Sequence, residues 1–198
     1  MSGGLAEGVE LLERAVGYTL GALSRVTKAS LCWPTPCTGW NLRALLRHLD
    51  DSLDVLSEGA DTGGVCPVRG APVPAEDVVA SVRARAGAVL GAWAGTIDAA
   101  EGDDHALAVG DLPLMASCAA GVGALEIAVH GWDISRTLGL RRPMPPELAT
   151  DLLEIARLTV GDTGRHPLFA AAVPVPPHTR EDDRLAAYLG RDPSRCGP

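Results

Sequence analysis

"ALEIAVHGWD", residues 124–133, places a carboxylate and an imidazole inside an otherwise apolar run. Glu126 and His130 are four residues apart, so on a helix both side chains lie on one face and point toward the same small volume. The surrounding residues are apolar nearly all round, which predicts that this helix is well buried. A buried glutamate must be ion-paired, protonated or bound to a metal. The stretch alone leaves two interpretations open, a metal site and an ion pair across one helical turn.

Apolar residues recur at spacings of three and four along most of the chain, which is typical of amphipathic helices. The pattern predicts helices at about 9–23, 42–53, 76–93, 114–138 and 145–158, and a short one at about 183–189. Asn41 is a candidate cap for the second helix, and Gly139 is a candidate stop for the fourth. Residues 58–75 and 95–113 are predicted to be irregular, and no alternation of period two is long enough for a sheet. The sequence therefore predicts an all-α protein, a four-helix bundle with additions.

Length and charge narrow the function classes. The 198 residues fit a single domain, 1–198, with a tail from about 168 to 198 that is extended and rich in proline before the short helix. The net charge is −8 and the arginines are scattered without a basic stripe, which argues against a nucleic-acid partner. No signal-peptide pattern and no membrane-spanning apolar run is evident, so we expect a cytoplasmic protein without a membrane partner.

The cysteines do not form a recognisable framework. There are five, an odd number, and no C-x-x-C pair occurs among them: Cys32, Cys37, Cys66, Cys118 and Cys196. This pattern argues against a set of disulfides and against a cysteine-based zinc ribbon.

Few residues are available to complete a site with Glu126 and His130. His48 lies on the predicted second helix, about 60° around it from Leu45 at 100° per residue. The other histidines fall in predicted loops or the tail: His105, His166 and His178. Two histidines and one carboxylate from facing helices would form a three-ligand metal site with an open position, which suits catalytic zinc or non-haem Fe(II). The alternative is that His48 is a partly exposed histidine with no metal.

Three stretches together resemble a known family. "PTPCTGWNLRALLRHL" (34–49), "EIAVHGWDISRTLG" (126–139) and "DRLAAYLGRDP" (183–193) resemble the DinB-like metal-binding family. The match is closest to the actinobacterial branch that includes the N-terminal domain of mycothiol-dependent maleylpyruvate isomerase. The resemblance implies a DinB-like four-helix bundle with an extra C-terminal helix and an irregular tail. It also implies that His48, Glu126 and His130 hold a divalent metal, with Zn(II) preferred and Ni(II) or Fe(II) as alternatives.

The resemblance further implies an activity. Family chemistry is metal activation of a low-molecular-weight thiol, mycothiol or a similar one, for S-transfer to a small electrophile or for its isomerisation. A free thiol has a pKa of about 8.5, and coordination to a dication removes its proton. The family's isomerase has a second, C-terminal domain, whereas this chain ends soon after the bundle, so we expect the shared thiol chemistry and not the isomerase reaction itself. A non-catalytic metal-binding or regulatory module and a biosynthetic enzyme that reuses the pocket are the alternatives; a homodimer is also open.

Several neighbours of the three residues have two interpretations each. Trp40 and Trp132 either line the pocket or pack in the core. Asp133 either orients the imidazole of His130 or pairs with Arg136. Cys37 is a candidate fourth ligand, but a role in packing or in the turn is the expected one.

Charged residues near His48 are expected to be solvated. This applies to two arginines, which are candidates for attracting an anionic substrate, and to three aspartates: Arg43, Arg47, Asp50, Asp51 and Asp54.

Overall fold

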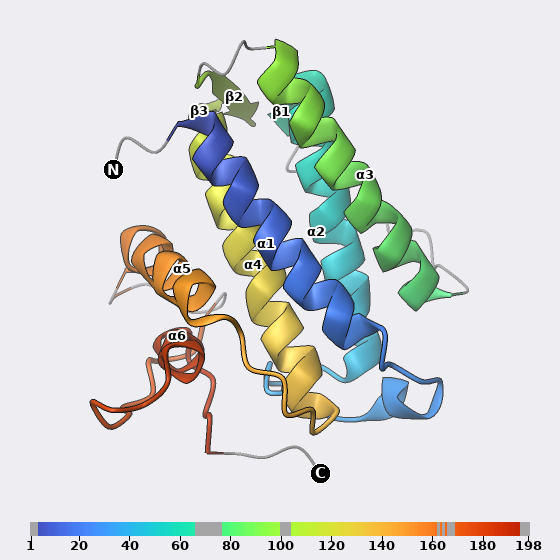
Figure 1. Cartoon of the computed structure of the whole chain (residues 1–198), viewed down its shortest axis with the longest axis vertical. Coiled ribbons are helices and arrows are strands. Elements are labelled where there is room, and N and C mark those ends of the chain that lie inside the picture. The colour runs from blue at the N-terminus through green and yellow to red at the C-terminus, as the bar shows by residue number, and fades with distance from the viewer. Residues whose placement is uncertain are drawn as a thin grey trace. The chain divides into compact units, whose positions relative to one another are not determined.

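The computed structural model describes residues 4–65, 77–99, 104–161, 163, 165 and 169–194. These residues are mainly helical, as Figure 1 shows. The helices are α1 (Leu5–Leu23), η1 (a 3-10 helix, Ala29–Cys32), α2 (Leu42–Thr62), α3 (Val78–Ala99), α4 (Ala116–Thr137), α5 (Pro146–Thr159) and α6 (Glu181–Tyr188). The predicted all-α class, a DinB-like four-helix bundle with C-terminal additions and an irregular tail, is confirmed. Cys66, His166 and Cys196 lie outside the described residues.

The chain divides into two compact units. The first comprises residues 1–16 and 46–127, and the second comprises residues 17–45 and 128–198. All three boundaries fall inside helices, so α1, α2 and α4 each contribute to both units.

In the first unit, α3 packs with segments of α1, α2 and α4 around a core of aliphatic side chains and Trp93, which is fully buried. Two glycines permit the closest approaches between helices. A Cβ on Gly8 of α1 would lie 2.8 Å from the Ser117 carbonyl oxygen of α4, and a Cβ on Gly123 of α4 would lie 2.5 Å from Leu56 of α2. Separations under 3 Å are too short for a carbon contact, so a larger residue at Gly8 would push against the α4 backbone, whereas one at Gly123 would displace the Leu56 side chain.

A small sheet adjoins these helices and was not expected from the sequence. It contains β1 (Gly64–Val65), β2 (Ala106–Val109) and β3 (Leu112–Met115). β2 pairs antiparallel with β3 and parallel with β1. The region predicted to be irregular, 95–113, thus holds the end of α3 and most of a hairpin. Four-residue strands are too short to show a clear alternation, although Gly110, with φ of +59°, marks the tight turn between them.

In the second unit, α5 and α6 pack against one another through Leu148, Leu152 and Leu185, each at most 1% exposed. The Tyr188 hydroxyl donates to the Val160 carbonyl at 2.7 Å, which ties the end of α6 to the end of α5. Among the described residues, no helix is both long enough and apolar enough to cross a bilayer.

Both predictions of helix boundaries are confirmed. The Ala44 N–H donates to the side-chain oxygen of Asn41 at 2.9 Å, which satisfies one free donor at the start of α2. Gly139 has φ of +63° after the end of α4, and the Leu140 N–H donates to the Ser135 carbonyl at 2.9 Å. This six-to-one bond and the left-handed residue before it are the Schellman arrangement, in which glycine avoids a Cβ penalty.

Replacing Asn41 tests the cap. We expect Asn41→Ala to lower the free energy of unfolding by about 1 kcal/mol, because the Ala44 N–H loses its acceptor. Asn41→Asp keeps a side-chain acceptor and should remain within a few tenths of the parent. Urea unfolding followed by circular dichroism at 222 nm measures both, and equal stability of the alanine variant and the parent would contradict the assignment.

Candidate metal centre

α2 and α4 carry the three residues that the sequence predicts as ligands. His48 Nε2 on α2 lies 2.5 Å from Glu126 Oε1 on α4. His130 follows Glu126 by one turn on the same continuous helix, so their side chains share a face. The potential ligand atoms of the three residues all lie within 4.8 Å of one another. The convergence predicted from sequence is therefore present.

The three side chains differ in their exposure to solvent. His130 is 4% exposed, whereas the side chains of His48 and Glu126 are 39% and 33% exposed. The stretch 124–133 is buried as predicted, except for Glu126, whose side chain is partly exposed. Its apolar neighbours on α4 face the core, but Glu126 itself points toward the half-exposed His48, at the margin of the apolar stripe of α2. The site thus has a buried ligand, His130, and two ligands that solvent can reach, His48 and Glu126.

This donor set fits a divalent metal ion. Two imidazole nitrogens and one carboxylate oxygen are ligand types that zinc, nickel and ferrous iron accept. Bonds near 2 Å around a tetrahedral ion place the ligand atoms about 3.3 Å apart. Small side-chain rotations would bring the three ligand atoms, now within 4.8 Å of one another, to that spacing. Glu126 also accepts a long hydrogen bond of 3.5 Å from the Ser52 hydroxyl, which restrains the carboxylate on the side of α2.

A buried carboxylate fixes the imidazole of His130. Asp133, 0% exposed, lies 3.0 Å from His130 Nδ1 through its Oδ2 atom. The same oxygen accepts from Arg191 Nη2 at 3.1 Å, and Oδ1 accepts from Arg191 Nε at 3.4 Å. Of the two interpretations of Asp133, the structure supports orientation of the imidazole. Arg136 instead donates to the Pro193 carbonyl and lies over the Trp132 ring, 5.0 Å from its centroid.

The charge state of Asp133 follows from these contacts. Burial alone would raise the pKa of this carboxyl, but the Arg191 guanidinium and the hydrogen bond from His130 outweigh burial and hold the pKa below its ordinary value. An ionised Asp133 accepts a hydrogen bond from Nδ1–H of His130, so Nε2 is the ring nitrogen that carries the lone pair. A carboxylate on the far nitrogen of a metal-binding histidine is a common arrangement, because it fixes the tautomer and raises the basicity of the ligand.

The aromatic neighbours have different roles. Trp40 stacks on the His130 ring with centroids 6.1 Å apart and an interplanar angle of 28°. Trp132 is 3% exposed and packs in the interior. Cys37 is a free, half-buried cysteine whose carbonyl accepts from the Trp40 N–H at 3.1 Å, so its backbone closes the turn before α2. The expected turn role of Cys37 is thus present, and Trp40 is the tryptophan that lies against a predicted ligand.

One expectation about the acidic residues beside His48 is wrong. Asp50 is 9% exposed, accepts a hydrogen bond of 2.7 Å from Ser81 and pairs with Arg85 at 3.2 Å. Asp54 pairs with the same Arg85. These contacts join α2 to α3. Asp51, as expected, is exposed to solvent.

The exposed arginines at the start of α2 agree with the expectation of a solvated surface; they are Arg43 and Arg47.

Sequence reasoning missed Arg191 and Ser52. Arg191 belongs to the quoted stretch "DRLAAYLGRDP", but its partner Asp133 is 58 residues away, and no local pattern links them. A signal was available for Ser52, because it follows His48 by four residues and therefore shares its helix face.

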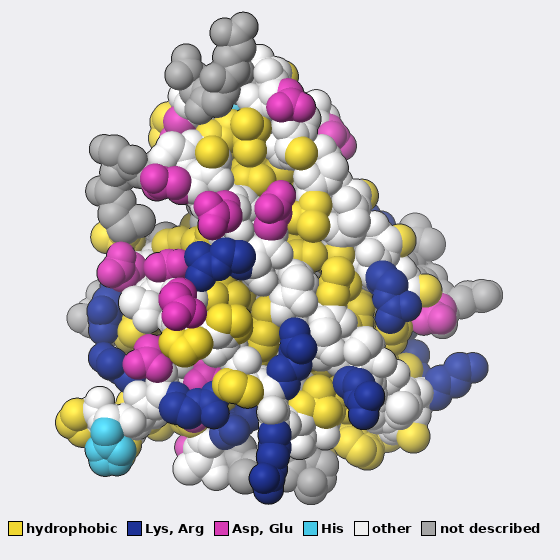
Figure 2. Space-filling view, viewed as in Figure 1, with side chains coloured by type: hydrophobic (Ala, Val, Ile, Leu, Met, Phe, Trp, Pro, Cys, Tyr) yellow, Lys and Arg dark blue, Asp and Glu magenta, His cyan; other side chains and the backbone are white. Residues whose placement is uncertain are grey.

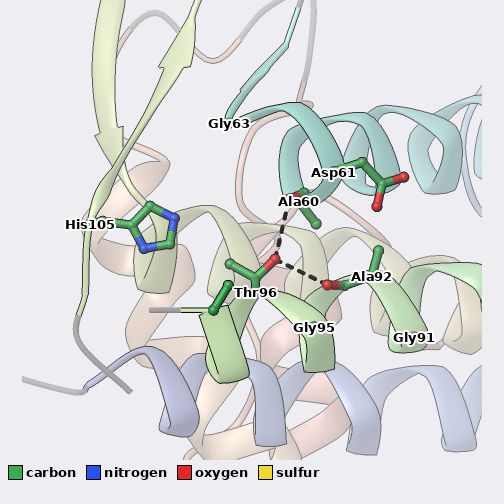
Figure 3. Close-up of a pocket in the computed structure, with 9 residues that line it drawn as sticks. Ala60, Asp61, Gly63, Gly91, Ala92, Gly95, Thr96 and His105 are labelled. Carbon is green, nitrogen blue, oxygen red and sulfur yellow. Dashed lines mark hydrogen bonds between the residues drawn. The ribbon is translucent and has the colours of Figure 1, made fainter. Parts of the chain in front are cut away.

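A separate hollow in the first unit has no comparable chemistry. It measures about 730 Å³ and is lined largely by small residues of α2 and α3, as Figure 3 shows. The Thr96 hydroxyl lies within hydrogen-bond distance of the Ala60 and Ala92 carbonyls, at 3.2 and 3.0 Å. His105 and Asp61 lie on different sides, and the Asp61 carboxylate points away from the imidazole. Without convergent polar groups, this hollow is not a candidate active site.

The pairing of Asp133 and Arg191 can be tested by a double-mutant cycle. Arg191→Met leaves a buried carboxylate without its guanidinium, and we expect a loss of about 3–5 kcal/mol in unfolding free energy. Asp133→Asn combined with Arg191→Met should lose clearly less than the sum of the single changes. Chemical denaturation of the four proteins gives the coupling energy, and additive losses would show that the pair is not energetically linked.

Comparisons with known proteins give a consistent family assignment. The family model described as the mycothiol maleylpyruvate isomerase N-terminal domain matches residues 12–135. Among relatives are two uncharacterized proteins of Mycobacterium tuberculosis, MT0763 of strain CDC 1551 / Oshkosh and Rv0738 of strain ATCC 25618 / H37Rv. Each is 30% identical over 184 residues, which cover 90% of this chain and 94% of the relative.

A crystal structure of the mycothiol-dependent maleylpyruvate isomerase is also similar, with a TM-score of 0.44 and 18% sequence identity. That alignment covers 76% of this chain and 67% of the isomerase chain. The family match at 12–135 contains His48, Glu126, His130 and Asp133, whereas Arg191 lies beyond it.

Proposed function

The chain belongs to the mycothiol maleylpyruvate isomerase N-terminal domain family, and from this membership we propose that it is a metal-dependent enzyme acting through a small thiol. The thiol is mycothiol or a close analogue, and the reaction is S-transfer to a small electrophile or its thiol-assisted isomerisation. His48, Glu126 and His130 are the proposed metal ligands, with Zn(II) preferred and Ni(II) or Fe(II) as alternatives.

One observation carries the proposal, the convergence of two imidazoles and a carboxylate to within 4.8 Å. An ion pair would need only His48 and Glu126, which already lie 2.5 Å apart. It would not require a third group, His130, whose Nδ1 is held by a buried carboxylate. This arrangement is that of a metal ligand held in one tautomer.

Exposure favours an enzyme over a structural metal site. Structural zinc sites are closed by four protein ligands, whereas catalytic sites have three and keep a position open. Here three candidate ligands are present, and two of them, His48 and Glu126, are at least one third exposed. A small thiol can therefore reach the ligand atoms without displacing core side chains.

Each residue of the site has its own role in the proposed reaction. When bound, a divalent cation lowers the pKa of a coordinating thiol from about 8.5, so that thiolate is available near neutral pH. Asp133 and Trp40 hold the His130 ring, and Ser52 restrains the Glu126 carboxylate. The thiolate sulfur would then bond to a carbon of the electrophile, either adding to a double bond and later leaving, or displacing a leaving group that departs with its electron pair.

Metal analysis tests the ligand set. We expect wild-type protein purified with added zinc to hold about one ion per chain, because catalytic zinc sites are formed by three protein ligands of these types. Glu126→Gln removes the charged ligand and should weaken zinc affinity at least about 10-fold. Glu154→Gln on α5, an exposed glutamate with the same change of charge, is the control and should not differ from wild type. Metal-free wild-type protein after zinc loading would refute the site.

Thiol binding tests the reaction class. Cobalt-substituted protein titrated with mycothiol should develop a sulfur-to-metal charge-transfer band in the near ultraviolet, because the thiol enters as thiolate. The His48→Ala variant loses an imidazole ligand and should lose the band. A loaded protein that shows no band and no thermal stabilisation at millimolar thiol would favour a non-catalytic module or a different small-molecule reaction.

A further inference from the structure

A small basic hollow lies in the second unit, where the end of α4, the α4–α5 connection and the start of α6 meet. It has a volume of about 270 Å³ and is lined by residues that include Ser135, Arg136, Arg141, Arg142, Arg180 and Asp182. We infer that this hollow is a binding site for a small oxyanion, a phosphate or carboxylate group, and that it is separate from the metal centre.

The first argument is charge. Four guanidinium groups and one carboxylate line the hollow, although the chain as a whole carries a net charge of −8. Only one of the four is neutralised: Arg180 donates to both oxygens of Asp182, at 3.0 and 2.5 Å. Basic side chains also gather on the lower part of the face drawn in Figure 2. The hollow therefore has an excess of positive charge in an acidic protein, and it would attract anions.

The second argument is that the remaining arginines are held by neutral partners. Arg142 lies over the Tyr18 ring, 5.6 Å from its centroid, and donates to the Tyr18 carbonyl at 3.4 Å. Arg136 lies over Trp132 and donates to the Pro193 carbonyl. Rings and carbonyls orient a guanidinium without cancelling its charge. In the described part of the chain, neither these two nor Arg141 forms a direct ion pair with a carboxylate. Asp183 lies near enough to Arg136 to offset part of its charge, so Arg141 and Arg142 carry most of the charge that is available to a ligand.

The third argument is a pair of buried donors. Ser135 is 2% exposed, and its hydroxyl lies near the Tyr18 hydroxyl but makes no hydrogen bond of normal geometry to a described residue. The Arg136 Nε–H is likewise buried with no acceptor among the described residues. Leaving a buried donor without an acceptor is unfavourable. An oxyanion at this position would offer the missing lone pairs.

The geometry of α4 separates this hollow from the metal centre. At 100° per residue, Trp132, Ser135 and Arg136 lie about 200°, 140° and 240° around the helix from His130. Trp132 and Ser135 are therefore on the face away from the proposed ligands, and Arg136 lies between the two faces. Guanidinium groups bind phosphate and carboxylate through paired N–H donors, which a thiolate does not match. The volume suits a small anion or the anionic end of a larger molecule.

Calorimetric titration of metal-free protein at low salt tests the site. Inorganic phosphate and succinate are the two probes, and the tighter one identifies the anion class. Arg141→Gln removes an exposed guanidinium that forms no ion pair with the described residues, and we expect it to weaken binding at least about 5-fold, as the loss of one charge-assisted hydrogen bond implies. Arg83→Gln on α3, an exposed arginine outside the hollow, is the matched control and should change binding less than about 2-fold.

The His48→Ala variant distinguishes this site from the metal centre, and it should bind the tighter anion as well as wild type does. The inference is overturned if neither anion binds, or if Arg141→Gln binds as tightly as the parent. It is also overturned if Arg83→Gln weakens binding equally or if His48→Ala abolishes it.

Discussion

The carboxylate of Asp133, buried without solvent contact, is the constraint on which the second unit depends. A charge at such a position is tolerated only when it is paired and hydrogen-bonded. Arg191 supplies the pairing charge and His130 supplies a hydrogen bond. Because Arg191 follows α6, the C-terminal segment must lie against α4 for Asp133 to be satisfied. The orientation of a candidate metal ligand and the docking of the tail therefore depend on one carboxylate.

This dependence makes the two ends of the metal centre unequal. His130 is packed by Trp40 and fixed by Asp133, so its position is set before any ligand arrives. His48 and Glu126 are partly exposed, and Glu126 contacts both His48 and Ser52. A rigid ligand at one end lowers the entropy cost of binding an ion, whereas solvent-exposed ligands at the other allow a further molecule to enter. That combination suits a site that exchanges small ligands.

Much of the fold could be predicted because its signals are local. Helix periods, the cap at Asn41 and the left-handed Gly139 depend on residues a few positions apart. The spacing of Glu126 and His130 is also local, and His48 is a candidate because it lies on the predicted second helix, a choice with which the family resemblance agrees. The predictions that failed concern residues whose partners are distant in the sequence. Asp50 is buried because Ser81 and Arg85 lie opposite it. The β2–β3 hairpin and the solvent exposure of Glu126 also arise from tertiary contacts that a one-dimensional pattern does not contain.

The arginines of the second unit show how partners decide the role of a side chain. Arg191 is ion-paired with Asp133, so its charge is neutralised and the pair stabilises the structure. Arg136 and Arg142 face carbonyls and aromatic rings, so they are equally well positioned but keep their charge. Sequence composition cannot separate the two cases, since all are arginines in an acidic chain. Because Asp133 and Arg191 balance one another, whereas Arg136 and Arg142 have mostly neutral partners, an anion is drawn to the hollow and not to the Asp133–Arg191 pair.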